Sequence, residues 1–169
     1  MSKPIKRFFT TILFALLYST SFNVFAQANQ AAKANTVVIQ DAWARATHPG
    51  QKVGAAYMTL TSPQDTALVK IESDVTESVE IHSMTMQNGV MKMRMLDKLP
   101  LAAEKPYKLA PGGFHLMLFD LKKPLLEGEQ LNLILHFTDK HNVASQQKIK
   151  VPVKSAENVN QDAGHEHHH

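Results

Sequence analysis

The sequence contains no cysteine, and this absence excludes several kinds of site at once. Without a thiolate ligand there is no blue-copper electron-transfer centre. There is also no Cys-x-x-Cys thiol oxidoreductase motif. Disulfides are excluded as well, although an exported protein could use them. A metal site in this chain therefore cannot be disabled by disulfide formation in an oxidising compartment.

The chain also lacks an excess of either charge outside its N-terminal segment. It has 18 Lys and Arg against 15 Asp and Glu, but three of the basic residues, Lys3, Lys6 and Arg7, lie within residues 1–28. Residues 29–169 then hold 15 of each sign, a formal net charge of zero. A surface that binds nucleic acid needs clustered basic residues to neutralise phosphates. Here the basic residues are scattered, so we expect no nucleic-acid partner.

Long apolar runs are scarce, and the run near the N-terminus is typical of a secretory signal peptide. A basic start is followed by a short apolar stretch over residues 12–18. Ala26-Gln27-Ala28 offers a small-residue cleavage site, with cleavage after Ala26 as the alternative. The run is too short and too polar for a committed membrane span, although a retained N-terminal anchor is the alternative. We expect a signal peptide over residues 1–28, a linker over 29–35, and a periplasmic protein without stable membrane insertion.

Helical periodicity is missing too, because no segment repeats apolar residues every 3.6 positions over a helical length. The sequence instead alternates in short segments, and residues 131–137 place four apolar side chains on one face. Such a pattern predicts an all-β sandwich over residues 36–154. The expected strands lie near residues 37–45, 54–61, 66–72, 77–86, 91–96, 106–109, 114–120, 130–138 and 146–153.

Methionine, by contrast, is concentrated in one window. Six of the eight methionines lie between residues 84 and 117. Asn88-Gly89 stands between two alternating segments, which is the strongest short-range signal for a two-residue β-hairpin. Side chains that face each other across such a hairpin point to the same side of the ribbon. The expected facing pairs are Met86 with Met91, Met84 with Met93, and His82 with Met95.

Core packing is the ordinary alternative explanation for methionine on a strand. We accept it for Met58, which alternates in phase with Ala56 and Leu60. We reject core packing for the hairpin methionines. A core-facing strand normally uses Val, Ile, Leu or Phe, and the row of methionines on the hairpin ends in His82. Thioethers are soft ligands that suit Cu(I), and imidazole suits copper as well. The hairpin therefore predicts half of a copper site.

The other half is predicted at His115 and Met117, which are two residues apart and so share one face of a strand. The complete spacing, His82-x10-Met93-x21-His115-x-Met117, resembles the signature of the periplasmic copper chaperones of the PCuAC family. The resemblance extends over about residues 36 to 153. It is carried by Asp41-Ala-Trp43-Ala-Arg45, Pro49-Gly50, Gly54-Ala-Ala-Tyr57-Met58, Asn88-Gly89-Val-Met91-Lys-Met93 and Pro111-Gly112-Gly113-Phe-His115-Leu-Met117.

This resemblance implies a cupredoxin-like, Greek-key β-sandwich with copper near one end. It implies a Cu(I) metallochaperone that delivers copper to the binuclear copper A centre of a respiratory cytochrome oxidase, alongside a Sco-type thiol chaperone. We expect a monomer. The implied Cu(I) ligands are His82, Met93, His115 and Met117. Met84 is the expected substitute ligand, and Met86 and Met91 are further auxiliary candidates.

Two other functions compete with copper delivery. One is copper buffering or tolerance without a dedicated acceptor. The other is an enzyme, but one common oxidative copper geometry needs a histidine as the mature N-terminal residue, and the two cleavage sites leave Gln27 or Asn29 instead. The sequence also offers no recognisable Ser-His-Asp or paired-carboxylate motif. We therefore expect no enzymatic activity.

The C-terminal segment, residues 155–169, is polar and ends in a histidine tract interrupted by Glu166. Its composition predicts disorder. Exposed histidine tracts bind metals, and they favour Cu(II) over Cu(I). An expression tag is the alternative, although a usual tag has six consecutive histidines. The predicted weak Cu(II) ligands are His165, His167, His168 and His169.

Overall fold

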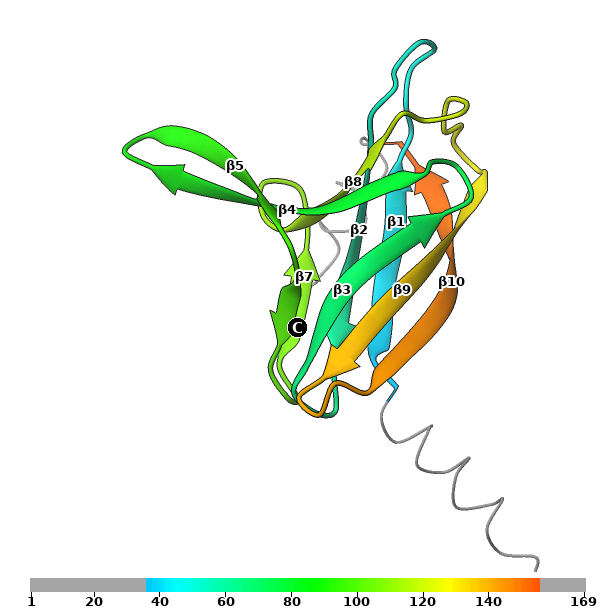
Figure 1. Cartoon of the computed structure of the whole chain (residues 1–169). Helices are drawn as coiled ribbons and strands as arrows, with labels where there is room; N and C mark the ends of the chain where they lie inside the picture. The colour runs from blue at the N-terminus through cyan, green and yellow to red at the C-terminus, as the bar shows by residue number, and fades with distance from the viewer. Residues whose placement is uncertain (1–35, 156–169) are drawn as a thin grey trace, which may run out of the picture. The chain divides into compact units, whose positions relative to one another are not determined.

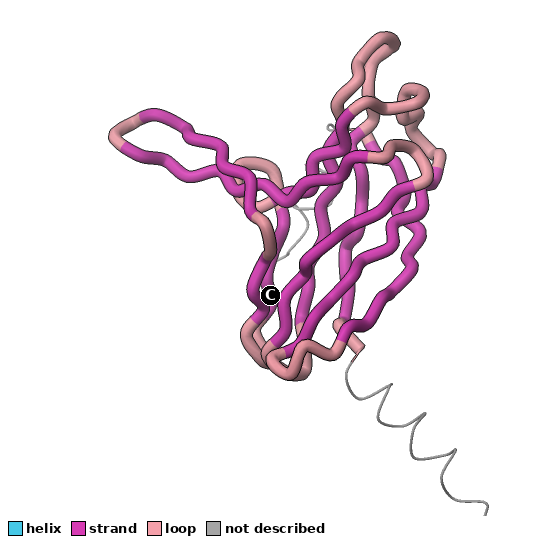
Figure 2. The backbone as a smooth tube through the Cα atoms, viewed as in Figure 1, coloured by secondary structure: helices cyan, strands magenta, loops and turns pink. Residues whose placement is uncertain are grey.

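The computed structural model describes residues 36–155 of the chain. The predicted signal peptide, the linker and the histidine tail beyond residue 155 lie outside the described residues. Residues 36–155 form strands, turns and loops without a helix, so the all-β prediction is confirmed (Figure 1, Figure 2). In the same residues there is no helix with the length and apolarity of a membrane span. The strands are β1 (Val38–Arg45), β2 (Gly54–Thr61), β3 (Thr66–Ser73), β4 (Ser78–Gln87), β5 (Val90–Leu96), β6 (Leu99–Leu101), β7 (Pro106–Leu109), β8 (His115–Phe119), β9 (Gln130–Asp139) and β10 (Ala144–Lys154).

The strands make two layers that share one continuous order. The first layer runs β5-β4-β8-β2-β1 and the second β10-β9-β3-β6, with β7 paired to β2. The layers join where β1 runs parallel to β10, through Ala44 with Val153 and Arg45 with Lys154. Figure 1 shows β3 and β9 lying over β1 and β2, with β10 at the side where the two layers join. The predicted two-layer sandwich is therefore present.

The core fills the space between these layers because each strand turns alternate side chains inward. Along β9, the side chains of Leu131, Leu133, Leu135 and Phe137 are at most 1% exposed. Met58, on β2, is also 1% exposed, so its expected role in core packing is confirmed. This core consists of apolar side chains, Met58 among them, and contains none of the predicted copper ligands.

The β4–β5 hairpin has the predicted turn. Asn88 and Gly89 have φ values of 52° and 77°, which is the backbone that a two-residue type I′ loop requires. The register follows from this loop, and it pairs Met86 with Met91 and Met84 with Met93. Figure 1 shows the hairpin projecting away from the rest of the sandwich.

One strand was missed by the sequence analysis. β6 consists of Leu99, Pro100 and Leu101 and pairs only with β3, at the edge of its sheet. Proline lacks the N–H that a central strand must donate, so a segment centred on proline gives a weak strand signal. An edge strand tolerates proline. The two flanking leucines are 2% and 1% exposed and pack in the core.

We expect the domain to fold without bound metal, because its core is separate from the histidine and methionine face. The metal-free mature chain should show a β-sheet circular dichroism spectrum and a single cooperative melt. Copper should raise the melting temperature only by mass action. As a control, Leu133→Ala should lower the free energy of unfolding of the metal-free protein by about 2–5 kcal/mol. A metal-free sample without a cooperative transition would contradict this expectation.

Candidate metal centre

Strands β5, β4 and β8 lie side by side and turn alternate residues to opposite faces. Ile81, Leu116 and Leu118 point into the core and are 3%, 0% and 0% exposed. The residues between them point to the outer face of the sheet, and the register aligns them across the three strands. This outer face carries Glu80, His82, Met84 and Met86 from β4, Met91, Met93 and Met95 from β5, and His115 and Met117 from β8.

His82 and His115 are direct cross-strand partners at the centre of this face. Both are buried, with 9% and 6% of their surface exposed, and their ring centroids lie 5.8 Å apart. A metal ion binds an imidazole nitrogen at about 2 Å. Two rings that share one ion therefore have their centroids roughly 6 Å apart at most. The observed spacing is suitable for one ion held between the two rings.

The hydrogen bonds of the two rings leave one nitrogen available on each. His115 Nδ1 lies 3.0 Å from the carbonyl oxygen of Gly113. Because a carbonyl only accepts, Nδ1 carries the proton and Nε2 has the lone pair. His82 Nε2 lies 2.7 Å from a carboxylate oxygen of Glu80, so the proton of the neutral ring is on Nε2.

Nδ1 of His82 is buried and has no hydrogen-bond partner within the described residues. A buried polar atom without a partner costs free energy, because it has lost its interaction with water and gained nothing in return. A metal ion bound at Nδ1 would supply the missing partner. The donor set therefore fits a metal that is held by His82 through Nδ1 and by His115 through Nε2.

The predicted thioether ligands differ in their distance from the histidine pair along the sheet. Met117 is two residues from His115 on the same face and is half-buried. Met93 is 50% exposed and lies diagonally from His82, whose direct partner on β5 is Met95. The structure thus brings both histidines and Met117 together. Met93 is farther out on the hairpin, and the complete ligand set remains a prediction.

Glu80 belongs to this site, although the sequence analysis did not identify it. It precedes His82 by two residues, so both side chains share a face, and its direct partner on β8 is Met117. The Glu80 side chain is 35% exposed, against 11% for His82. A carboxylate that accepts the N–H of a metal-binding histidine fixes the tautomer and orientation of the ring. The two-residue spacing from His82 is the signal that would have identified Glu80.

An aromatic cluster occupies the same face on the neighbouring strands. A bulge before Trp43 in β1 turns its ring away from the core, and the ring lies 4.5 Å from that of Tyr57. The Arg45 guanidinium lies 5.9 Å from the Tyr57 ring centroid. Burial raises the pKa of the Tyr57 hydroxyl, and the nearby charge of Arg45 lowers it by a smaller amount. Ala55, the partner of Met117, precedes Tyr57 by two residues, so the cluster shares the outer face of the metal site.

No alternative cluster of oxygen and nitrogen ligands is present in the described chain. Within residues 36–155, no three His, Cys, Asp or Glu side chains come close enough to hold a metal ion. His136 lies on the outer side of β9 and pairs with Glu72 at 3.2 Å, while His48 and His141 are exposed.

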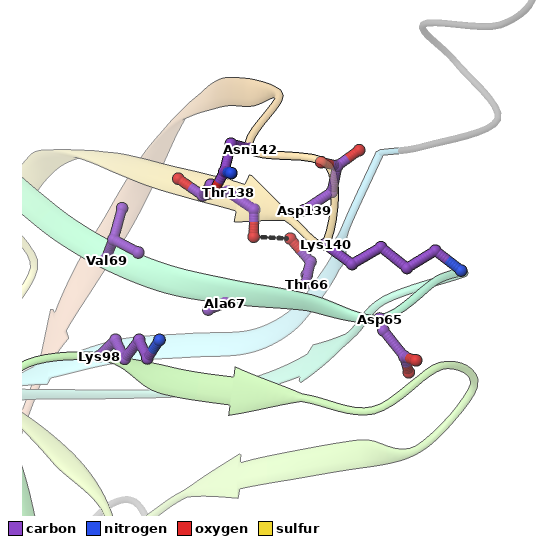
Figure 3. Close-up of a pocket in the computed structure, with 9 residues that line it drawn as sticks. All are labelled: Asp65, Thr66, Ala67, Val69, Lys98, Thr138, Asp139, Lys140 and Asn142. Atoms are coloured by element: carbon purple, nitrogen blue, oxygen red, sulfur yellow. Dashed lines mark hydrogen bonds between the residues drawn. The ribbon is translucent and has the colours of Figure 1, made fainter.

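A concave region between the ends of β3 and β9 is unrelated to this site (Figure 3). Two of its polar groups are already paired. The Thr66 hydroxyl donates to the Thr138 carbonyl at 3.0 Å, and the Asp139 carboxylate accepts from the Val143 amide at 2.9 Å. The nine residues that line the region include neither histidine nor methionine. We assign no ligand to it.

The sequence matches one protein family and is similar to proteins of two bacteria. The family model described as "Putative lipoprotein LpqE-like" matches residues 37–153. "Putative lipoprotein Lxx21020" of Leifsonia xyli subsp. xyli is 28% identical over 131 residues, which cover 77% of this chain and 76% of that protein. "Uncharacterized protein RP573" of Rickettsia prowazekii is 33% identical over 134 residues, which cover 73% of this chain and 74% of that protein.

Solved structures share the fold. The solution structure of CuI-DR1885 from Deinococcus radiodurans has a TM-score of 0.58 at 28% identity, covering 77% of this chain and 87% of that one. The copper-bound PCuAC domain from PmoF2 has a TM-score of 0.57 at 22% identity, covering 70% of this chain and 92% of that domain. The predicted cupredoxin-like sandwich is confirmed by these likenesses. The chain therefore belongs to the LpqE-like family, which confirms the predicted relationship to PCuAC proteins.

Proposed function

We propose that this protein is a periplasmic Cu(I) metallochaperone. The observation that carries the proposal is the buried pair of His82 and His115, with an unpartnered Nδ1 on His82 and Met117 beside them. Two neutral imidazoles and neutral thioethers suit Cu(I), and a ligand set without charge favours capture and release over permanent binding. Copper here is the cargo of the protein.

The comparisons support copper as the cargo. Two similar structures, CuI-DR1885 and the PCuAC domain from PmoF2, are copper-bound forms. The likeness to these copper-bound structures supports a binding role rather than catalysis. Export of the chain is supported by the description of the family and of one relative as putative lipoproteins. The predicted signal peptide over residues 1–28 would provide the route.

We further propose that the acceptor is the copper A centre of a cytochrome oxidase, with a Sco-type thiol chaperone as a second partner. A site on the outer face of a sheet, next to an exposed hairpin, allows the ligands of an acceptor to replace those of the donor one at a time. Copper buffering without an acceptor is the alternative, and the predicted Cu(II) tail at His165, His167, His168 and His169 would raise buffering capacity. Oxidase delivery is our first proposal because it is what the resemblance to the PCuAC copper chaperones implies.

The site is tested by titration of the mature chain with a Cu(I) probe under reducing conditions. His115→Ala and Met117→Leu should each weaken the tight Cu(I) equivalent by more than about 10-fold, because each removes a donor atom. His136→Ala is the matched control, since it removes an imidazole from the outer face of the opposite layer. X-ray absorption of the Cu(I) form should report both nitrogen and sulfur neighbours. Unchanged affinity in both site variants would refute the proposed site.

Delivery and buffering are separated in a strain that lacks the protein. If the protein delivers copper, the strain should lose cytochrome oxidase activity when copper is scarce and recover it when copper is added. If the protein buffers copper, the strain should instead become sensitive to excess copper while its oxidase activity stays normal. Complementation with His115→Ala should fail in either case, whereas His136→Ala should restore the parental behaviour.

The role of Glu80 gives a further prediction, with one measurement on the metal-free protein and one on Cu(I) binding. In the metal-free protein, two-bond ¹H–¹⁵N NMR should show His82 as the Nε2–H tautomer and His115 as the Nδ1–H tautomer. Glu80→Ala should give His82 a mixture of tautomers and weaken Cu(I) binding by about 10–100-fold. Glu77→Ala, which removes a carboxylate that is 91% exposed, should change neither measurement. A proton on Nδ1 of His82 in the parent protein would contradict the assignment.

A further inference from the structure

The outer part of the β4–β5 hairpin carries methionines that the fold itself does not need. Met86, Met91 and Met93 are 63%, 43% and 50% exposed. Every residue from 85 to 95 is exposed, on both faces of the ribbon. In contrast, Met58 is 1% exposed within the core. Packing therefore accounts for Met58 and does not account for the hairpin methionines.

The register gathers these exposed thioethers into a block. Met86 is directly opposite Met91, and Met84 is directly opposite Met93. Side chains that face each other across a strand pair have Cβ atoms about 5 Å apart, and neighbours along one face are roughly 7 Å apart. Methionine has three rotatable side-chain bonds, so its sulfur adapts to a shared ligand. Several thioether sulfurs can therefore converge on one ion from this block.

The chemistry of the block selects one class of ion. Thioethers are neutral, soft donors, which bind Cu(I) and the similar ion Ag(I) rather than hard or borderline cations. The opposite face of the hairpin carries Lys92 and Arg94, which repel a cation weakly through screened solvent. Exposure to water and the neighbouring positive charges make this block a weaker site than the buried histidine pair.

We propose that Met84, Met86 and Met91 form a second, weaker Cu(I) site on the outer hairpin, which receives copper before the histidine pair does. This proposal deepens the copper-carrier function proposed above and rests on it. Met93 faces Met84 and also lies diagonally from His82. It is therefore the shared ligand through which Cu(I) moves from the exposed thioethers to the buried imidazoles.

The test compares Cu(I) stoichiometry in the parent mature chain and in a Met86→Leu, Met91→Leu double variant, which leaves Met84 in place beside the histidine pair. Leucine keeps the size and apolar character of methionine while removing the sulfur. The parent should bind a tight equivalent and a weaker second equivalent, and the double variant should lose only the second. Met58→Leu is the control for loss of a methionine elsewhere and should retain both. The histidine tail is present in every variant, so its contribution cancels.

A second readout locates the ion directly. Ag(I), which is redox-inert, should shift the methyl signals of Met84, Met86 and Met91 in ¹³C-methionine NMR after the tight equivalent is filled. Retention of the second equivalent in the double variant, or its absence from the parent, overturns the proposal. His115→Ala separates this proposal from the proposed function. If His115→Ala leaves the tight equivalent intact, the proposed function fails. Loss of the second equivalent in the double variant still supports the hairpin site in that case.

Discussion

The register of β4 against its two neighbours determines where every candidate ligand lies. β4 pairs with β5 through a two-residue loop and with β8 through a separate ladder, and both ladders meet at His82. Side chains alternate along a strand, so a slip of one residue would turn His82 into the core and bring Ile81 out to water. The burial of Ile81, Leu116 and Leu118 makes such a slip costly. The hydrophobic core thus fixes the geometry of a site to which it contributes no ligand.

This arrangement separates stability from metal chemistry. The core lies between the two layers, and the histidine and methionine side chains lie on the opposite face of one layer. The ligand strands therefore stay paired whether or not a metal is present. The outer hairpin is different, because a two-stranded ribbon without a covering layer is only marginally stable in water. A ligand that joins its two strands would order it, while the inner part of the site stays preorganised.

The sequence predicted those parts of the structure that depend on local chemistry. Asn88-Gly89 specifies a tight turn by its backbone preference, and the alternation on either side then defines the facing pairs. Nine of the ten strands within residues 36–155 follow from alternation and turn residues. β6 was missed because Pro100 weakens a strand signal, and only its place at the sheet edge makes that residue acceptable.

The features that escaped prediction depend on partners distant in sequence. The direct pairing of His82 with His115 joins residues from strands that are not consecutive, so their spacing alone could place them on one face but not opposite each other. The bulge in β1 likewise changes the side to which Trp43 points, because one extra residue shifts the alternation. Glu80 is the exception, because its partner His82 is only two residues away and this spacing already indicated a shared face.

Along the outer face the exposed fraction of the side chains changes, and this change bears on how the proposed copper carrier would release its ion. From the hairpin tip toward β8, the candidate ligands change from exposed thioethers to buried imidazoles, with Met86 63% and His115 6% exposed. Burial lowers the effective dielectric constant around a cation and removes competing water, so neutral donors bind more strongly at the inner end. An acceptor can approach the outer end first, where each bond is weakest and several interchangeable sulfurs are available. Transfer by stepwise ligand exchange then needs no opening of the core, because the ligands already lie on the accessible side of the sheet.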